Sequence, residues 1–273
     1  MPVSQRLPVL VLVCSSVIWG ATWIPLKYFA AQGLDGAALL LLAYGSVAVL
    51  AVPVLWRRFL WKQGRRWRAE WRFMLGIFLL GGYANVAFNT SVMYGDVVRA
   101  MSLFYTLPVW AVLGGIVFLG ERLTPARALS VLLALAGAWL ILGGTDILAQ
   151  PPSWLDALAM SSGFAYAMNN IIFRATPAAP IQPKIALMFF SGAVFSGLVL
   201  VVSALFGGQQ QWPSQAAPSL LLLACAFGVG WMLLANIGTQ WAVTHLEAGR
   251  AAVIIILELV TTIITAMWIN DDQ

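Results

Sequence analysis

Residues 85–100 read NVAFNTSVMYGDVVRA, and residues 236–251 read NIGTQWAVTHLEAGRA. A shift of 151 residues aligns Asn85 with Asn236, Asn89 with Gln240, Arg99 with Arg250 and Ala100 with Ala251. Earlier in each half, Ser15-Ser16 matches Ser161-Ser162 at a shift of 146 residues. Similarity at a nearly fixed spacing indicates a repeated structural unit. The sequence therefore predicts two copies of one unit, at residues 1–145 and 146–273.

The composition places both copies in a membrane. Of the 273 residues, 61% are hydrophobic and 9% are charged, which does not describe a water-exposed surface. A helix needs about 20 mainly apolar residues to cross roughly 30 Å of hydrocarbon. We expect spans at 7–30, 34–56, 71–93, 96–119, 125–143, 153–174, 184–206, 217–243 and 246–270. This predicts an all-α integral membrane protein whose short connectors leave no room for a soluble domain.

The basic residues are distributed unevenly between the two sides of these spans. Only two of the 15, Lys27 and Arg99, lie outside if the N-terminus is cytoplasmic. The others lie inside: Arg6, Arg57, Arg58, Lys62, Arg65, Arg66, Arg68, Arg72, Arg122, Arg127, Arg174, Lys184 and Arg250. The positive-inside rule thus predicts a multi-pass protein with a cytoplasmic N-terminus. Tryptophans are interleaved with the cluster at 57–72, so we interpret it as an interfacial anchor and expect no nucleic-acid partner.

The second copy is predicted to be inverted. Spans one to four resemble spans six to nine, and a shift of five spans is odd, so the two copies enter the membrane from opposite sides. Inverted-topology repeats are typical of secondary transporters, whose substrate site lies near the midplane between the halves. The span at 125–143 has no counterpart before the sequence stops at residue 273. A truncated chain, a tenth helix supplied otherwise and a true nine-span protein all remain open.

Polar side chains inside spans are costly in hydrocarbon, so they usually face the bundle interior or a wet cavity. Asn85 and Asn89 are four residues apart and share one helical face, as do Asn236 and Gln240. Such amides either hydrogen-bond neighbouring helices or line a cavity, and the sequence favours neither. Together with nearby aromatic and polar residues they form our candidate substrate site: Trp19, Trp23, Asn85, Asn89, Met101, Tyr105, Tyr166, Asn169, Trp231, Asn236, Gln240 and Glu258.

Glu258, about halfway along the ninth span, is the only carboxylate more than four residues from the end of a predicted span. A lone ionised carboxylate there costs at least about 2.5–3.5 kcal/mol on insertion scales. We therefore expect Glu258 to be protonated, paired or hydrated in a cavity. It is interpreted as a proton relay or as the partner of a substrate amine, with a structural pair to Thr or Lys as the alternative.

Two prolines predict interruptions of the spans. Pro25 lies inside the first span and Pro108 inside the fourth. Each lacks a backbone N–H, so the carbonyls of Ala21 and Phe104 lose their helical donors. The resulting kinks can widen a cavity or act as hinges.

Several chemistries have no support in the sequence. Cys14 and Cys225 both fall inside spans, and His245 is the only histidine, so neither a disulfide framework nor a multi-histidine metal centre is expected. There is no paired intramembrane Asp, no G-x-S-x-G elbow and no P-loop. No repeated selectivity element of the kind often seen in channels is visible either. We expect no enzyme and no cofactor.

The sequence resembles the drug/metabolite transporter superfamily, in particular its EamA-type members. The resemblance is carried by Asn89, Gly95-Asp96, Arg99, the helix containing Pro108, and the turn Gly120-Glu121-Arg122-Leu123. Among EamA-type proteins it looks most like YddG-type inner-membrane exporters of aromatic amino acids and other metabolites. This resemblance implies ten helices in two inverted repeats of five, a central cavity, and alternating access without ATP. The sequence departs from the pattern in its missing tenth helix and in Asp271-Asp272, which stand where the first repeat has Gly120-Glu121.

These features predict a monomeric secondary transporter in a bacterial inner membrane. Its partners would be the lipid bilayer and a small-molecule substrate, an amino acid or a small hydrophobic metabolite. Aromatic walls suit amino acids with flat side chains and flat organic cations. The alternative is a nucleotide-sugar or phosphorylated-metabolite exchanger, which would normally need intramembrane cations. Since the spans hold no well-buried cation apart from Lys27 towards one end, we expect polyanions to be disfavoured.

Overall fold

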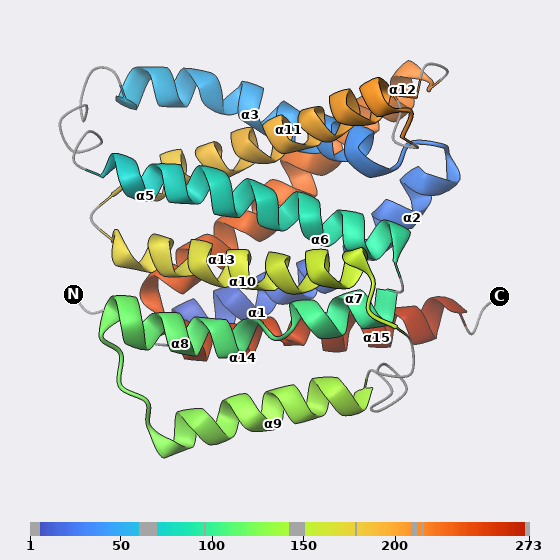
Figure 1. Ribbon diagram of the computed structural model, residues 1–273. Coiled ribbons are helices and arrows are strands. Elements are labelled where there is room, and N and C mark those ends of the chain that lie inside the picture. The colour runs from blue at the N-terminus through green and yellow to red at the C-terminus, as the bar shows by residue number, and fades with distance from the viewer. Residues whose placement is uncertain are drawn as a thin grey trace.

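The computed structural model describes residues 6–59, 70–95, 97–141, 151–177, 179–208, 212–213 and 216–270. Every regular element in these ranges is a helix, and the helices lie side by side in one bundle (Figure 1). In chain order they are α1 (Arg6–Gly20), α2 (Trp23–Ala31), α3 (Gly36–Phe59), α5 (Trp71–Gly76), η1 (Ile77–Gly81), α6 (Gly82–Tyr94), α7 (Val97–Phe104), α8 (Leu107–Leu119), α9 (Pro125–Ile141), α10 (Trp154–Ala175), α11 (Ile181–Phe206), α12 (Pro218–Phe227), η3 (Gly228–Met232), α13 (Leu233–His245), α14 (Ala248–Ile255) and α15 (Leu257–Asn270).

Seven helices in the described ranges are long and apolar enough to cross a membrane: Arg6–Ala31, Gly36–Pro53, Trp71–Val92, Arg99–Leu119, Ile181–Phe206, Pro218–His245 and Ala248–Ile269. The prediction of a multi-pass, all-helical membrane protein is confirmed at this level. α9 has 17 residues, and α10 carries several polar residues among its 22, so neither is among the seven. The count of nine spans therefore stays a prediction.

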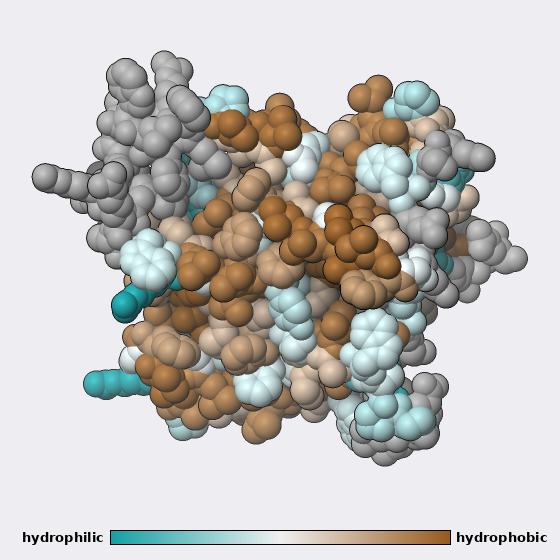
Figure 2. Space-filling model, turned by 45° about the horizontal axis from the view of Figure 1, so that its top comes forward, coloured by the Kyte–Doolittle hydropathy of each residue, from teal (hydrophilic) through white to brown (hydrophobic). Residues whose placement is uncertain are grey.

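The surface fits a lipid environment. Apolar side chains cover the middle of the face seen in Figure 2. Large apolar residues are also strongly exposed on several helices, among them Leu205 on α11 and Leu222 on α12, at 73% and 71%. Monomeric soluble proteins rarely expose apolar patches of this extent. Hydrocarbon, in contrast, covers such a surface at no cost.

The helices are interrupted at both prolines, as predicted. The first span breaks between α1 and α2, where the Ile24 N–H bonds the Ala21 carbonyl at 3.2 Å. The Gly20 carbonyl then accepts a hydrogen bond from Thr262 Oγ1 of α15 at 2.9 Å. The fourth span breaks between α7 and α8. The break between α14 and α15 has no proline and was not predicted.

The element bounds recur at the spacing of the sequence match. The π-helical turns η1 and η3 begin at Ile77 and Gly228, which are 151 residues apart, and α6 and α13 keep the same spacing at both of their ends. A π-helical turn is rare and is often found at functional sites. Its presence at equivalent positions supports a structural repeat, while the inverted orientation of the two halves in a membrane stays a prediction.

Helices of each half pack on helices of the other half. α1 packs on α13 and α15, and its counterpart α10 packs on α6 and α8, which are the counterparts of α13 and α15. α3 packs on its own counterpart, α11. Reciprocal contacts of this kind are expected when two halves are related by a two-fold axis. α9 lies at the edge of the bundle, against α14 and α8 (Figure 1).

The bundle has two ends with different ion pairs. The turns between α8 and α9 and between α10 and α11 lie at the left in Figure 1. We call this the Glu121 end, because Arg174 Nε of α10 lies 2.9 Å from Glu121 Oε1 there. At the other end, the Arg99 end, Arg99 Nε of α7 lies 2.8 Å from Asp156 Oδ1 of α10. Which end is cytoplasmic stays a prediction, and Lys62, Arg65, Arg66, Arg68, Asp96, Asp271 and Asp272 lie outside the described residues.

The expected position of the buried cation is wrong. Lys27 is exposed, whereas Lys184 in the first turn of α11 is only 1% exposed. Its ammonium donates to the carbonyl oxygens of Phe173, at 3.2 Å, and Thr176, both at the end of α10. A cation is favourable at a helix C-terminus, where backbone carbonyls lack intrahelical donors. Lys184 therefore caps a neighbouring helix.

Candidate functional site

A cavity of about 100 Å³ lies in the middle of the bundle. It is lined by residues from α1, α2, α6, α7, α10, η3 and α15, and from the breaks between helices: Trp19, Gly20, Thr22, Trp23, Leu26, Ala84, Asn85, Phe88, Asn89, Val92, Met101, Phe104, Tyr105, Tyr166, Met232, Glu258 and Thr262. Val92 and Met101 lie close to the Arg99 end, and none of the lining residues comes from α8 or α14. The cavity thus extends from mid-bundle towards the Arg99 end.

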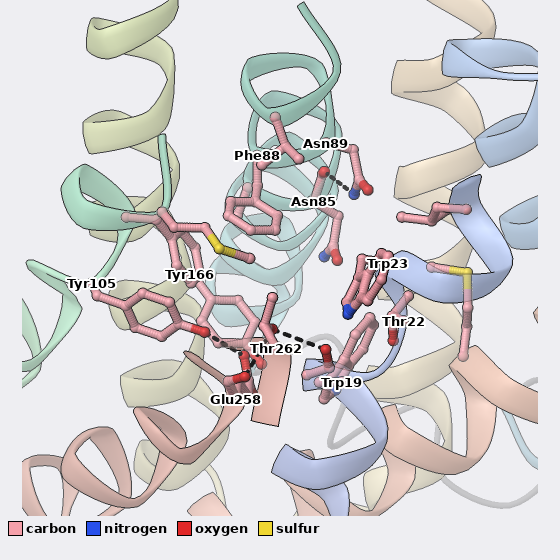
Figure 3. Close-up of a pocket in the computed structure, with 17 residues that line it drawn as sticks. Trp19, Thr22, Trp23, Asn85, Phe88, Asn89, Tyr105, Tyr166, Glu258 and Thr262 are labelled. Atoms are coloured by element: carbon pink, nitrogen blue, oxygen red, sulfur yellow. Dashed lines mark hydrogen bonds between the residues drawn. The ribbon is translucent and has the colours of Figure 1, made fainter. Parts of the chain in front are cut away.

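Aromatic rings form two facing walls of the cavity. Trp19 and Trp23 stand on one side in Figure 3, and Tyr105 and Tyr166 stand on the other. Phe104 also lines the cavity and packs on both tyrosines, with its ring centroid 5.4 Å from that of Tyr105 and 5.9 Å from that of Tyr166. Flat rings in this arrangement favour stacking with a flat ligand and contacts with a cation.

Glu258 supplies the acidic group of the cavity. It is the only Asp or Glu among the described lining residues, and no Lys, Arg or His lines the cavity in that part of the chain. It lies in the first turn of α15, where the free N–H groups of a helix start favour a carboxylate. Tyr105 donates a long hydrogen bond of 3.4 Å to Glu258 Oε2. With Glu258 ionised, the site suits a cation or an ammonium group.

One donor and one acceptor in the lining lack protein partners. Glu258 Oε1 and Trp19 Nε1 are buried and have no hydrogen-bond partner among the described residues. A buried polar group that stays unpaired costs about 1–3 kcal/mol, so such atoms commonly bind a ligand or water. The neighbouring indole of Trp23 is different, because its Nε1 donates to Thr265 Oγ1 at 2.9 Å.

Asn85 and Asn89 line the cavity but also bond their own helix. Asn85 Nδ2 donates to the Gly81 carbonyl in η1 at 2.7 Å, and Asn85 Oδ1 accepts from Tyr44 at 2.8 Å. Asn89 Nδ2 donates to the Asn85 carbonyl at 2.7 Å (Figure 3). Both alternatives left open by the sequence thus apply to Asn85, which stabilises the π-helical turn and lines the cavity.

Eight of the twelve candidate residues line the cavity: Trp19, Trp23, Asn85, Asn89, Met101, Tyr105, Tyr166 and Glu258. Trp231 lies behind it and donates from Nε1 to Thr22 Oγ1 at 2.9 Å. Asn169 is buried against Met188 of α11. Asn236 and Gln240 are buried on α13, where Gln240 Nε2 donates to Asn170 Oδ1 at 3.3 Å. These four residues are not in the lining.

The candidate site left out other lining residues, such as Thr22, Phe88, Phe104 and Thr262. The signal for Thr262 was present, because it shares one helical face with Glu258 four residues earlier. Phe88 lies between two candidate asparagines, and its ring centroid is 4.4 Å from that of Phe104. Apolar residues of this kind resemble ordinary core residues until the fold is known.

The described residues contain no group of three His, Cys, Asp or Glu side chains that could hold a metal ion. The two cysteines, Cys14 and Cys225, are both free thiols.

The chain matches one protein-family model and is similar in fold to a solved structure. The model of the EamA-like transporter family matches residues 6–143. No curated protein matches the chain. A solved crystal structure, described only as that of a protein, is similar in fold, with a TM-score of 0.71 and 18% sequence identity over 96% of this chain and 89% of that chain. At this identity the likeness concerns the fold alone.

Proposed function

The chain belongs to the EamA-like transporter family, and from that premise we propose that it is a secondary transporter of aromatic amino acids and small hydrophobic metabolites. It exports or exchanges them by alternating access, as a monomer in a bacterial inner membrane. The Glu121 end is then cytoplasmic and the Arg99 end faces outward, in keeping with the positive-inside rule.

The observation that carries this proposal is the pairing of Glu258 with an aromatic cavity. An amino acid presents an ammonium group, a carboxylate and a side chain. Glu258 Oε1 accepts from the ammonium group, and Trp19 Nε1 donates to the carboxylate; both atoms lack partners among the described residues. The facing rings of Trp23 and Tyr105 accommodate a flat side chain.

The lining of the cavity disfavours the alternative, an exchanger of nucleotide sugars or phosphorylated metabolites. Phosphate groups are recognised by Arg, Lys or the backbone N–H groups of helix starts. The described lining contains neither Arg nor Lys, and Glu258 would repel a polyanion. Lys184, the buried cation, bonds the end of α10 and does not line the cavity.

The direct test is counterflow with purified protein in liposomes. Vesicles loaded with unlabelled phenylalanine, tryptophan or a flat organic cation should accumulate the labelled compound, with and without a pH gradient. Glu258→Gln should lower accumulation of amine-bearing substrates by roughly 10- to 150-fold, because a hydrogen bond to a charged group contributes about 1.5–3 kcal/mol. The matched control is Glu247→Gln, which makes the same change at an exposed position outside the lining.

Equal counterflow by Glu258→Gln and the parent protein would remove Glu258 from substrate recognition. Accumulation of sugar phosphates in place of amino acids would support the exchanger instead.

A further inference from the structure

A second, much smaller pocket continues the cavity towards the Glu121 end. It is lined by Leu107, Ala111, Ala167, Asn170, Arg174, Val243, Ala248, Ala251 and Ala252, and we call it the alanine pocket. Its volume of about 10 Å³ holds at most one water molecule. On α10, Tyr166 lines the cavity while Asn170 and Arg174, one and two turns further on, line the alanine pocket. The two spaces therefore lie in series along the bundle.

The 151-residue shift maps part of the alanine pocket onto the cavity. Four of its residues have counterparts in the cavity lining: Leu107 corresponds to Glu258, Ala111 to Thr262, Val243 to Val92 and Ala252 to Met101. The helices follow the same relation. α8 packs closely on α14, whereas their counterparts α15 and α7 are separated by the cavity. At the Glu121 end α8 and α14 thus pack together, whereas their counterparts α15 and α7 are apart towards the Arg99 end.

A carboxylate holds the closed end together. Glu121 Oε1 accepts from Arg174 Nε of α10 at 2.9 Å and from the Ala248 backbone N–H, at the start of α14, at 3.1 Å. Glu121 follows α8, and its side chain is only 9% exposed. A Cβ added at Gly115 would lie 3.0 Å from Glu121 Oε2 and 3.4 Å from the Ala248 Cβ, so α8 and α14 approach closely beneath the carboxylate. One side chain thus joins α8, α10 and α14.

Polar groups are also buried between the two spaces. Gln240 is fully buried; its Nε2 bonds Asn170, and its Oε1 has no hydrogen-bond partner among the described residues. Asn236, one turn earlier on α13 and nearer to Met232 of the cavity, also has an unpartnered oxygen. If the alanine pocket widened, water or substrate would reach these atoms and supply their missing hydrogen bonds. An apolar core has no such polar atoms to satisfy.

We propose that the alanine pocket is the closed half of the substrate route, and that Glu121 is the latch that keeps it closed through Arg174 and the Ala248 N–H. This rests on the proposed function, since it gives the transporter its second opening. Opening requires α8 and α14 to separate, and this breaks both contacts of Glu121 Oε1. The latch residues do not line the cavity, so they act on the opening of the route and not on the affinity of the cavity.

The test measures access to the alanine pocket without measuring transport. Ala251, which is 3% exposed, is replaced by Cys in a background in which Cys14 and Cys225 are Ser. The rate of modification by a water-soluble maleimide is then measured for the purified protein. Arg174→Gln and Glu121→Gln should each raise this rate about ten-fold, which corresponds to about 1.4 kcal/mol. The matched control, Arg99→Gln, breaks the ion pair at the other end of α10 and should leave the rate unchanged.

Unchanged modification in both latch variants, with the protein still monodisperse, would overturn the latch. An equal rise in Arg99→Gln would also overturn it, because general loosening would then explain the effect. The readout separates this proposal from the proposed function. Faster modification in a protein that shows no counterflow would support the latch and contradict the assigned substrates, whereas counterflow with unchanged modification would do the reverse.

Discussion

Lys184→Met removes the one cation that is fully buried in the described part of the chain while keeping the length of the side chain. In the folded protein the ammonium donates to the carbonyls of Phe173 and Thr176 and lies 5.4 Å from the centre of the Phe173 ring. Met donates no hydrogen bond. The substitution therefore leaves the Phe173 carbonyl without a donor, whereas the Thr176 carbonyl keeps the backbone N–H of Ala179, at 3.2 Å.

The expected cost follows mainly from the Phe173 carbonyl, which loses its donor, and to a smaller extent from the Thr176 carbonyl, which loses one of two. Each buried acceptor that loses its partner costs about 1–3 kcal/mol. Met recovers part of this, because an apolar side chain is cheaper to bury than a charge. We expect a net loss of about 1–3 kcal/mol, which at about 2–4 °C per kcal/mol for a chain near this size lowers the melting midpoint by roughly 2–12 °C.

The assay is thermal unfolding in detergent, followed by the loss of the monodisperse peak in size-exclusion chromatography. The control is Lys27→Met, the same change at an exposed Lys whose Nζ lies 5.0 Å from the centre of the Trp23 ring. Exposed substitutions usually change stability by less than about 0.5 kcal/mol. If Lys184→Met melts at the same temperature as Lys27→Met, the cap on α10 does not contribute to stability and the reasoning is refuted.

Three further substitutions test the helix contacts by the same thermal assay. Gly228→Ala should cost about 1–3 kcal/mol, because its Cβ would collide with a backbone carbonyl of α3. The control is Gly230→Ala in the same π-helical turn, whose Cβ would meet no atom within 4 Å. Equal melting midpoints for the two variants would contradict this prediction. Asn85→Ala should also cost about 1–3 kcal/mol. Adding Tyr44→Phe to this variant should lower its stability little further, because both substitutions remove the same hydrogen bond. If the two losses of stability add in full, the bond contributes nothing. Ser153→Ala should cost about 0.5–2 kcal/mol, since Ser153 caps α10 in a capping box, and an unchanged midpoint would show that this helix start needs no cap.

The helix positions could be predicted largely from the sequence, because hydropathy and proline act locally. The predicted spans at 71–93, 153–174 and 184–206 correspond to Trp71–Tyr94, Trp154–Ala175 and Ile181–Phe206. The breaks near Pro25 and Pro108 follow from a missing N–H, which a sequence displays directly. Eight of twelve candidate residues reached the cavity for a similar reason, since polar and aromatic side chains in spans tend to face inward.

The remaining features depend on contacts between distant segments. η1 and η3 have no residue signature, and Ile256 interrupts a helix without a proline. The burial of Lys184 could not be predicted, because its acceptors belong to the end of another helix. Trp231 precedes the cavity residue Met232 in the chain, but its indole N–H donates to Thr22, which lies in the break between α1 and α2. Only the packing decides which face of a polar helix meets a cavity and which meets a neighbour.

The residues related by the 151-residue shift are unequal in size. The closed end packs Ala111 and Ala252, and the corresponding positions at the open end hold Thr262 and Met101. Closing the Arg99 end would bring these bulkier side chains together. We therefore expect the outward-open and inward-open states to differ in free energy, even at equal substrate concentrations on both sides of the membrane. We expect a resting orientation that exposes the binding site to one compartment, and hence unequal half-saturation concentrations measured from the two sides.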